Sequence, residues 1–264
     1  MIFLKTEDEI KLLKASNQLV GKTLAELASH IAPGVTTSQL DKVAETFIRD
    51  NGAEPTFKGF PNLKGEPYPA SICTSINEVV VHGIPNNQAL REGDIISIDC
   101  GVKMNGFCGD SAYTFAVGEI NSEKQQLLDI TKKALYEGIG VSRVGNRVGD
   151  IGYAIQTLCE INSYGVVREF TGHGIGKSMH EDPYVPNFGS KGSREQLISG
   201  LCIAIEPMIT LGNRHIKMLN DGWTVVTKDN KPAAHFEHTI VITQSGPQIL
   251  SSFEELEQVI GVKA

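Results

Sequence analysis

The sequence predicts an α+β fold with a mainly antiparallel sheet and its helices outside the sheet. Three observations lead to this class. Strand-like segments follow one another in the middle of the chain, a two-residue turn joins two of them into a hairpin, and helical segments come in pairs. The helix–helix–strand order of approximately residues 1–120 recurs in residues 121–264. We therefore expect one domain, residues 1–264, made of two pseudo-symmetric halves.

The first two helices are predicted by their caps and their apolar spacing. Thr6 and Glu9 have the spacing of a capping box, in which each side chain bonds the backbone N–H of the other residue. Apolar residues then recur at helical intervals up to the Pro-Gly pair at positions 33–34. A second apolar stripe begins after Thr36 and ends at Gly52, which predicts a second helix.

Three strands are predicted next along the chain. Residues 71–82, 94–102 and 107–117 are rich in Ile, Val, Tyr and Phe, which favour extended structure. Asn105 and Gly106 stand between the last two segments, and this dipeptide is a strong signal for a two-residue hairpin turn. The turn therefore sets the register of the whole hairpin.

The second half repeats this order. Two helical segments are followed by apolar segments that predict strands. The expected helices cover residues 122–135 and 148–161, and the expected strands lie near residues 166–170, 201–209, 222–227 and 236–243.

Composition excludes several classes of protein. The 264 residues carry 24 Lys and Arg against 31 Asp and Glu, a net charge of −7, which disfavours nucleic acid or an anionic membrane as a partner. No segment approaches the ~20 consecutive apolar residues of a membrane span, and the start of the chain lacks a secretory signal. The five cysteines are odd in number and lack paired spacing, so we expect reduced thiols in a cytoplasmic protein.

Two aspartates stand in the predicted hairpin. The Asn105–Gly106 turn places Asp99 opposite Ala112, so that Asp110 lies diagonally beside Asp99 on the same face of the sheet. Either aspartate alone could face solvent on an edge hairpin, but the apolar neighbours of both favour burial. Two buried carboxylates repel each other unless a cation or a shared proton compensates.

Two glutamates repeat this pattern in the second half. Glu206 ends an apolar strand just before Pro207, and Glu237 lies inside another strand. They could be unrelated carboxylates in ion pairs, but neither segment has a Lys or Arg nearby. The sequence therefore contains four carboxylates that need positive charge from elsewhere.

A histidine completes a candidate set of metal ligands. His173 lies in a glycine-rich loop, Thr-Gly-His-Gly-Ile-Gly, where the backbone can turn tightly. Such a histidine is ordinarily only a loop residue, but the four carboxylates favour its interpretation as a metal ligand. An oxygen-rich set of this kind suits divalent Mn, Fe, Co or Zn, and carboxylates can bridge two such ions. Paired ions generate hydroxide at neutral pH for hydrolysis.

Two further histidines have positions suited to catalysis. His82 stands at the end of a predicted strand, and His180 comes soon after His173. Either one could donate to a substrate carbonyl or to the departing nitrogen, or it could be a satisfied surface residue. The other histidines are expected to be satisfied surface residues: His30, His215, His235 and His238.

These motifs, in their order along the chain, resemble those of the bacterial-type type I methionine aminopeptidases of peptidase family M24. The matching segments are INEVVVHGIP, DIISIDCGV, GFCGDSAYTFAVG, TGHGIG, HEDP, IEPM and FEHTIVIT, which span essentially the whole chain. Five metal-ligand positions in the same order make the match specific. The resemblance implies the pita-bread fold, in which a curved antiparallel sheet joins two similar halves.

The resemblance also implies the ligands of the metals. It implies a dinuclear site whose ligands are Asp99, Asp110, His173, Glu206 and Glu237. In the family, the first aspartate and the last glutamate sit with one metal, and the second aspartate and the last glutamate bridge both.

Catalytic roles are implied in the same way. His180 would polarise the scissile carbonyl, and His82 would stabilise the transition state near the scissile amide. Glu206 would handle the proton beside a metal-bound hydroxide that attacks the carbonyl. The implied reaction removes the initiator methionine from nascent proteins whose second residue is small.

The resemblance extends to the pocket for the methionine side chain. The aligned positions are Tyr68, Cys73, Met179 and Trp223. An apolar cup of this kind suits a thioether, although a lone tryptophan could equally be a core residue. Met179 stands where relatives commonly carry Phe, and segment 57–67 is longer than usual. Whether Phe57 or Phe60 lines the pocket is therefore left open.

The remaining implications concern other ions and partners. Relatives suggest a monovalent cation held by backbone carbonyls near Asn77 and Val79, although Ala233 stands where they often have Ser. The expected partners are nascent polypeptide N-termini at the ribosome, with no direct contact to nucleic acid or membrane. A monomer is expected.

Two other functions remain as alternatives. A prolidase or proline aminopeptidase shares this fold but usually carries a long N-terminal domain, for which 264 residues leave no room. A catalytically inactive member of the fold, acting as a binding protein, would be expected to lose metal ligands. All five ligand positions are present here, which favours the aminopeptidase.

Overall fold

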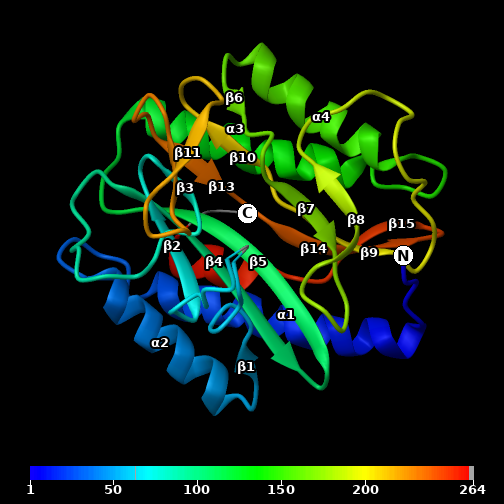
Figure 1. The fold of residues 1–264 in the computed structure, drawn as a ribbon, viewed down its shortest axis with the longest axis horizontal. Coiled ribbons are helices and arrows are strands. Elements are labelled where there is room, and N and C mark those ends of the chain that lie inside the picture. Colours follow the sequence, from blue (N-terminus) through cyan, green and yellow to red (C-terminus); the bar gives the residue numbers. More distant parts are fainter. Residues whose placement is uncertain (63, 262–264) are drawn as a thin grey trace.

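Two pairs of long helices enclose a layer of β-strands in the computed structural model, which describes residues 1–62 and 64–261. Helices α1 (Glu7–Ala28) and α2 (Thr37–Asp50) lie on one side, and α3 (Ser122–Gly140) and α4 (Val148–Ile161) lie on the other (Figure 1). Every pairing within the sheets of the described residues is antiparallel. The predicted α+β class is thus confirmed.

The helices begin where the sequence places their caps. Thr6 and Glu9 form the capping box of α1, and Thr36 forms a second box with Gln39 at α2. Each half of the chain opens with a longer helix followed by one of 14 residues. The element order therefore recurs, and the boundary between the halves near residue 120 stays a prediction.

The strands of the first half include the predicted hairpin. They are β1 (Glu54–Pro55), β2 (Ile72–Ile76), β3 (Val79–Val81), β4 (Ile95–Met104) and β5 (Phe107–Ala116). Asn105 and Gly106 connect β4 to β5 with φ of 52° and 82°, the left-handed conformation that this turn requires. The predicted hairpin is thus confirmed.

The single strand expected over residues 71–82 is wrong. The chain turns at Asn77, whose φ is 49°, and β2 and β3 belong to different sheets. The side chain of Asn77 bonds Asp94 and the N–H of Ile95, and these bonds hold the turn. Asparagine tolerates this backbone conformation better than most residues, and the surrounding β-branched residues hide the break in the sequence.

The second half contains ten shorter strands and a last helix among the described residues. They are β6 (Gly165–Val166), β7 (Thr171–Gly174), β8 (Glu181–Pro186), β9 (Cys202–Ile205), β10 (Met208–Thr210), β11 (Ile216–Met218), β12 (Val225–Thr227), β13 (Ala233–His235), β14 (His238–Thr243), β15 (Gly246–Ile249) and α5 (Glu254–Val259).

Three of the strands expected here are broken or shifted. The strand expected near 166–170 is wrong, because β6 ends at Val166 and β7 begins at Thr171. The strand expected over 201–209 divides at Glu206 and Pro207, since proline lacks the N–H that a ladder needs. Glu237 likewise lies between β13 and β14 and not inside a strand.

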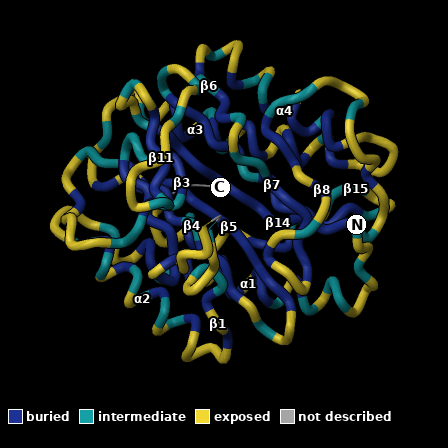
Figure 2. Tube along the Cα trace, in the orientation of Figure 1, coloured by how far each residue is buried: buried dark blue, intermediate teal, exposed yellow. Residues whose placement is uncertain are grey.

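The largest hydrophobic cluster joins the two halves. It contains Leu24 from α1, Ile98 from β4, Leu135 from α3 and Ile205 from β9, all with no exposed surface. Figure 2 shows the central strands β4, β5 and β14 as buried and the outer surfaces of the helices as more exposed. The sheets therefore form a buried, apolar frame between the helix pairs.

Two expectations about surface and redox chemistry can be compared with the structure. No helix in the described part of the chain is long and apolar enough to cross a membrane. All five cysteines are buried and unpaired, as predicted for reduced thiols.

The contact between α1 and β5 generates a stability prediction. A Cβ at Gly109 would lie 2.6 Å from the backbone N of Asn17, so Gly109→Ala forces the helix off the strand. We expect a loss of about 1–3 kcal/mol in the free energy of unfolding, measured with urea. The matched control is Gly140→Ala, where no atom lies within 4 Å of the new Cβ. Equal losses in the two variants would contradict this packing.

Candidate metal centre

The β4–β5 hairpin brings two aspartates to one place. Asp99 pairs with Ala112, and Asp110 pairs with Gly101, which is the diagonal arrangement predicted from the turn. One carboxylate oxygen of each aspartate is buried and has no hydrogen-bond partner among the described residues. Such atoms are costly unless they bind a cation or hold a proton.

His173 approaches these aspartates from β7. It lies in a strand, so the expected loop is wrong. Its neighbours Gly172 and Gly174 have no room for a Cβ, because backbone oxygens of β9 and β8 lie 2.3 and 2.2 Å from those positions. The glycines therefore permit close packing of three strands and do not make a flexible loop.

The ring of His173 is oriented by a backbone contact. Its Nδ1 lies 2.9 Å from the carbonyl oxygen of Gly174, to which only a protonated Nδ1 can donate. Nε2 is then free of hydrogen and faces the carboxylates of Asp110 at 3.6 Å and Glu206 at 3.7 Å. An orienting bond of this kind is typical of metal-binding histidines.

Glu206 and Glu237 lie side by side at the ends of neighbouring strands. β9 pairs with β14 so that Ile205 faces His238. Glu206 directly follows Ile205, and Glu237 directly precedes His238. The side chain of Asn187 donates to the carbonyl of Glu206. Donor atoms of Asp110, His173 and Glu237 all lie within 4.8 Å of one another.

Hydrogen bonds join β5 to the segment that carries Glu237. The N–H of Glu237 donates to the carbonyl of Ala112 at 2.9 Å, and Ser111 Oγ donates to the carbonyl of Glu237 at 2.6 Å. Thr239 Oγ1 donates to the carbonyl of Asp110 at 2.9 Å. The backbones of Asp110 and Glu237 are therefore fixed relative to each other.

The electrostatics of the cluster favour a bound cation. Burial raises the pKa of Asp99, Glu206 and Glu237 well above their usual values, and the neighbouring carboxylates raise them further. Burial also raises the pKa of Asp110, to about 8. The ion-pair partners of these carboxylates among the described residues are histidines, with no lysine or arginine. This donor set fits divalent metal ions, which favour carboxylate and imidazole ligands.

The two histidines predicted to be catalytic lie around this cluster. The ring of His180 stands edge-on to His173 with centroids 4.4 Å apart, and it also stands edge-on to Phe60 at 5.2 Å. His82 has φ of 58°, a conformation that non-glycine residues adopt mostly where function or local structure demands it. Burial lowers the pKa of His82 to about 4, so its imidazole is neutral at pH 7.

The residues predicted for a methionine pocket lie close together. Tyr68, Cys73 and Trp223 belong to one apolar cluster, in which the Tyr68 and Trp223 rings meet edge-on at 5.1 Å. Phe57 packs against this cluster and also against the cluster that contains Met179. Phe57 therefore connects the pocket residues, while Phe60 lies against His180. Their roles in binding substrate stay predictions.

Two histidines expected at the surface are buried. His235 is 2% exposed, its Nε2 lacks a hydrogen-bond partner among the described residues, and this atom lies 3.7 Å from Glu206. His238 is also buried and bonds Ser251 and Tyr136. His235 stands two residues before Glu237, a spacing that puts both on one face of an extended chain, so this signal was present in the sequence.

The expected monovalent-cation site remains a prediction. The carbonyl of Asn77 accepts a hydrogen bond from the N–H of Ala233 at 2.8 Å. The Asn77 side chain contacts Lys124, whose ammonium also donates to the carbonyl of Gly93. A lysine ammonium thus already lies close to Asn77.

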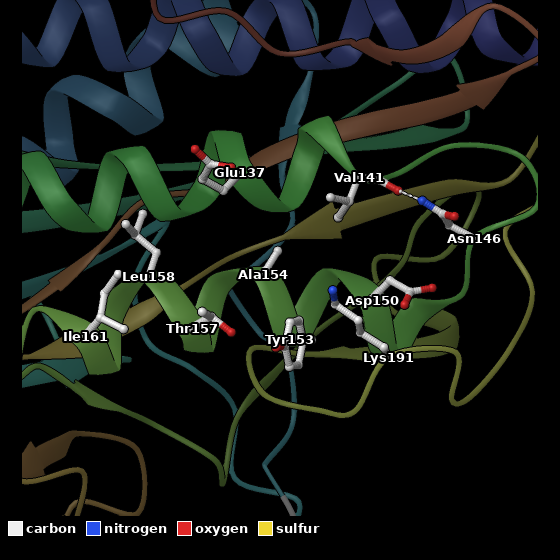
Figure 3. Close-up of a pocket in the computed structure, with 10 residues that line it drawn as sticks. All are labelled: Glu137, Val141, Asn146, Asp150, Tyr153, Ala154, Thr157, Leu158, Ile161 and Lys191. Carbon is white, nitrogen blue, oxygen red and sulfur yellow. Dashed lines mark hydrogen bonds between the residues drawn. The ribbon is translucent and has the colours of Figure 1, made fainter.

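A separate groove lies on the outer face of the molecule, between α3 and α4 (Figure 3). Its volume is about 560 Å³, and Glu137, Tyr153 and Lys191 are among its lining residues. None of the predicted site residues lines it. The groove is therefore distinct from the carboxylate cluster.

Comparison with known proteins identifies the family. The sequence pattern of "Metallopeptidase family M24" matches residues 11–244. The chain belongs to metallopeptidase family M24. This membership and the cluster of Asp110, His173 and Glu237 together indicate a divalent-metal site.

Individual members of family M24 resemble the chain over nearly its whole length. The methionine aminopeptidase of Clostridium perfringens is 49% identical over 95% of this chain and 99% of its own length. Methionine aminopeptidase 1 of Bacillus subtilis is 47% identical over the same shares. These identities place the chain with the bacterial-type methionine aminopeptidases.

Solved structures of similar proteins have the same fold. The methionine aminopeptidase of Rickettsia prowazekii superposes with a TM-score of 0.92 at 41% identity, covering 96% of this chain and 100% of that one. A prolidase from Pyrococcus furiosus gives a TM-score of 0.75 at 20% identity, covering 95% of this chain and 66% of that one. The prolidase likeness shows the fold alone, and the predicted pita-bread fold is confirmed.

Metal removal is expected to change the pH dependence of stability. The pKa of Asp110 is raised to about 8 in the folded chain, against roughly 3.9 for an unfolded aspartate. Between these values the folded chain holds more protons, so the stability of metal-free protein falls as pH rises. Metal binding displaces such protons and removes the penalty.

The measurement is the melting temperature with EDTA and with excess Mn²⁺ at pH 5.5 and pH 7.5. We expect Mn²⁺ to raise the melting temperature more at pH 7.5 than at pH 5.5. A rise that is equal at both values, or larger at pH 5.5, would contradict a metal site built from these carboxylates.

Proposed function

We propose that this protein is a metal-dependent methionine aminopeptidase that removes the N-terminal methionine from nascent proteins with a small second residue. The observation that carries this proposal is the buried Asp110–His173–Glu237 cluster in a chain of family M24. The names of relatives 47–49% identical over 95% of the chain support the substrate.

Five residues would hold the metals. Asp110, His173 and Glu237 have donor atoms already close together, and Asp99 and Glu206 adjoin them. We assign two divalent ions to this set, of Mn, Fe, Co or Zn. When bound, such ions lower the pKa of water toward neutrality and polarise a carbonyl oxygen.

His180 and His82 would act on the peptide bond. His180 stands at the mouth of the cluster beside His173, where its N–H can donate to the scissile carbonyl oxygen. His82 stands near Trp223, on the side of the methionine pocket, where it can donate toward the scissile amide. Donors fixed in this way stabilise charge that develops in the transition state.

Glu206 would carry the proton. Its two carboxylate oxygens face different imidazoles, His173 on one side and His235 on the other. In the balanced reaction, the C–N bond breaks, the water oxygen joins the carbonyl carbon, and one water proton must reach the leaving nitrogen. A carboxylate whose pKa is raised by burial is suited to accept that proton and release it.

The methionine side chain would lie in the apolar cluster beside this centre. Tyr68, Cys73 and Trp223 offer aromatic edges and a thiol, and Met179 adds a flexible thioether opposite Phe57. Tyr68 keeps a fixed orientation because its hydroxyl donates to the carbonyl of Gly83 at 2.8 Å. An unbranched thioether packs favourably against such groups.

Further parts of the proposal concern its surroundings. We assign the protein to the cytoplasm as a monomer that meets nascent chains at the ribosome. A monovalent cation near Asn77 and Val79 is retained as part of this proposal, with the nearby Lys124 ammonium as a competing positive charge.

Peptide hydrolysis tests the proposed function. With Mn²⁺ or Co²⁺ present, we expect release of methionine from Met-Ala-Ser and none of alanine from Ala-Pro-Ser. Asp110→Asn and His180→Ala should each lower kcat/KM by about 100-fold or more, because a ligand or a transition-state donor is lost. His30→Ala changes an exposed histidine just after α1; it serves as the matched control and should keep full activity.

Two outcomes would overturn this proposal. One is turnover of Ala-Pro-Ser in preference to Met-Ala-Ser, which would make the protein a prolyl-specific enzyme of the same fold. The other is unchanged activity in folded Asp110→Asn and His180→Ala proteins, with circular dichroism as the check of folding.

A further inference from the structure

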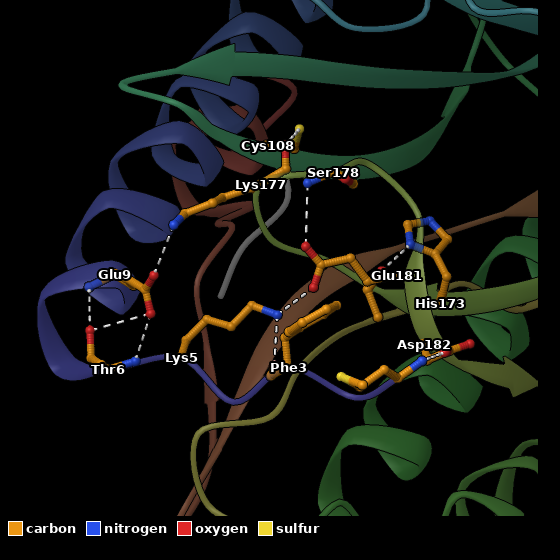
Figure 4. A network of polar contacts seen from close by, with 12 residues as sticks. Phe3, Lys5, Thr6, Glu9, Cys108, His173, Lys177, Ser178, Glu181 and Asp182 are labelled. Carbon is orange, nitrogen blue, oxygen red and sulfur yellow. Dashed lines mark hydrogen bonds and ion pairs between the residues drawn. The ribbon is translucent and has the colours of Figure 1, made fainter.

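The segment before α1 lies against the segment that carries His180. We call residues 1–9, which include the first residues of α1, the N-terminal arm, and residues 175–181 the His180 loop. Figure 4 shows side chains of the arm bonded to side chains of this loop. The mechanism proposed above makes no use of these contacts.

The central contact is a buried ion pair. The ammonium of Lys5 contacts the carboxylate of Glu181, and the two side chains are only 6% and 9% exposed. Glu181 also accepts from the N–H of Ser178, while the Lys5 ammonium donates to the carbonyl of Phe3 at 2.8 Å. A lysine is almost never buried this far without a partner, so the pair acts as a unit.

The arm and the loop fit closely around this pair. A Cβ at Gly176 would lie 2.6 Å from Cε of Lys5 and 2.4 Å from Oε1 of Glu181. The backbone of Lys5 is itself fixed, because its N–H donates to the carbonyl of Gly200 at 2.8 Å. The loop therefore rests on an anchored lysine.

A second ion pair joins the same two segments, with the acidic residue on the arm and the lysine in the loop. Glu9 on α1 lies 3.4 Å from Lys177 in the loop, and Glu9 is held in place by the capping box with Thr6. Lys177 is largely exposed, so this pair contributes less than the buried one. Lys5 and Glu9 of the arm thus each face an opposite charge in the loop.

The rest of the loop is fixed on its inner side. The N–H of Cys108 donates to the carbonyl of Gly176 at 2.8 Å. Ile175 and Met179 pack in a buried cluster with Leu13 of α1. His180, between Met179 and Glu181, thus lies between an apolar anchor and a charged one.

We propose that Lys5 and Glu181 are positioning residues that hold the His180 loop, and with it the imidazole of His180, against the metal centre. This inference rests on the function proposed above. Loss of either partner leaves a buried charge uncompensated, which the loop can relieve only by moving toward solvent. Even ~1 Å of misplacement in a catalytic group can cost up to about 100-fold in rate.

The test compares Lys5→Met with Lys11→Met. Lys11 is exposed to solvent and pairs with Asp8, and both residues lie on α1. For Lys5→Met we expect kcat on Met-Ala-Ser to fall about tenfold or more, with less change in KM. The dissociation constant for Mn²⁺ should not change, because His180 is not among the proposed ligands. Lys11→Met should match the wild type in all three quantities.

A second readout needs no enzymatic activity. Lys177 is exposed within the loop, so trypsin can cut after it once the loop leaves its place. We expect cleavage after Lys177 to be several-fold faster in Lys5→Met than in the wild type or Lys11→Met. Combining Lys5→Met with Glu181→Gln should lower kcat no further than either change alone, because the two act through one contact.

The outcomes separate this inference from the proposed function. If the wild type releases no methionine, the function fails, and the proteolysis still tests the arm. If the wild type is active but Lys5→Met equals it in kcat and in cleavage rate, the positioning role fails. Additive losses in the double variant, or a parallel loss of Mn²⁺ affinity, would also overturn it. Glu181→Gln replaces Lys5→Met if the latter does not fold.

Discussion

Four carboxylates converge in the interior of this protein, and their mutual repulsion is the constraint on which its structure depends. Asp99 and Asp110 come from one hairpin, and Glu206 and Glu237 come from the other half of the chain. Burial raises the pKa of every one of them. A fold that forces such groups together without a cation loses stability, so the site and its metals have to be considered as one unit.

The surrounding structure can bear this repulsion because many buried contacts and hydrogen bonds hold it together. Asp99, Asp110 and His173 lie in paired strands, and Glu206 and Glu237 directly adjoin strand ends. Bonds from Ser111 and Thr239 tie β5 to the segment around Glu237. One hydrophobic cluster spans both halves, so separating the two halves would expose apolar surface to water. The frame therefore holds the oxygen ligands close together in spite of their mutual repulsion, which is the arrangement that a metal site needs.

Much of this arrangement follows from local sequence rules. The Asn105–Gly106 turn sets the hairpin register, and that register alone predicts that Asp99 and Asp110 lie together. Pro207 explains the strand break beside Glu206, but proline alone does not reveal which strand lies next to it. The lack of a nearby Lys or Arg indicated Glu206 and Glu237, the glycine-rich segment indicated His173, and the resemblance implied the same five positions.

Other features depend on contacts between distant residues and escaped sequence reasoning. His235 was expected at the surface, yet it is buried beside Glu206 because β13 packs onto β10. The turn at Asn77 depends on a hydrogen bond to Asp94, which comes after β3 in the sequence. The pairing of Lys5 with Glu181 spans most of the sequence and leaves no periodic signal.

The central claim is that the carboxylate cluster binds divalent metal, and anomalous diffraction from a crystal grown with Mn²⁺ tests it most directly. We expect two anomalous peaks about 3.5–4 Å apart, surrounded by Asp99, Asp110, His173, Glu206 and Glu237. Absence of any peak between Asp110, His173 and Glu237 in crystals saturated with Mn²⁺ would contradict it.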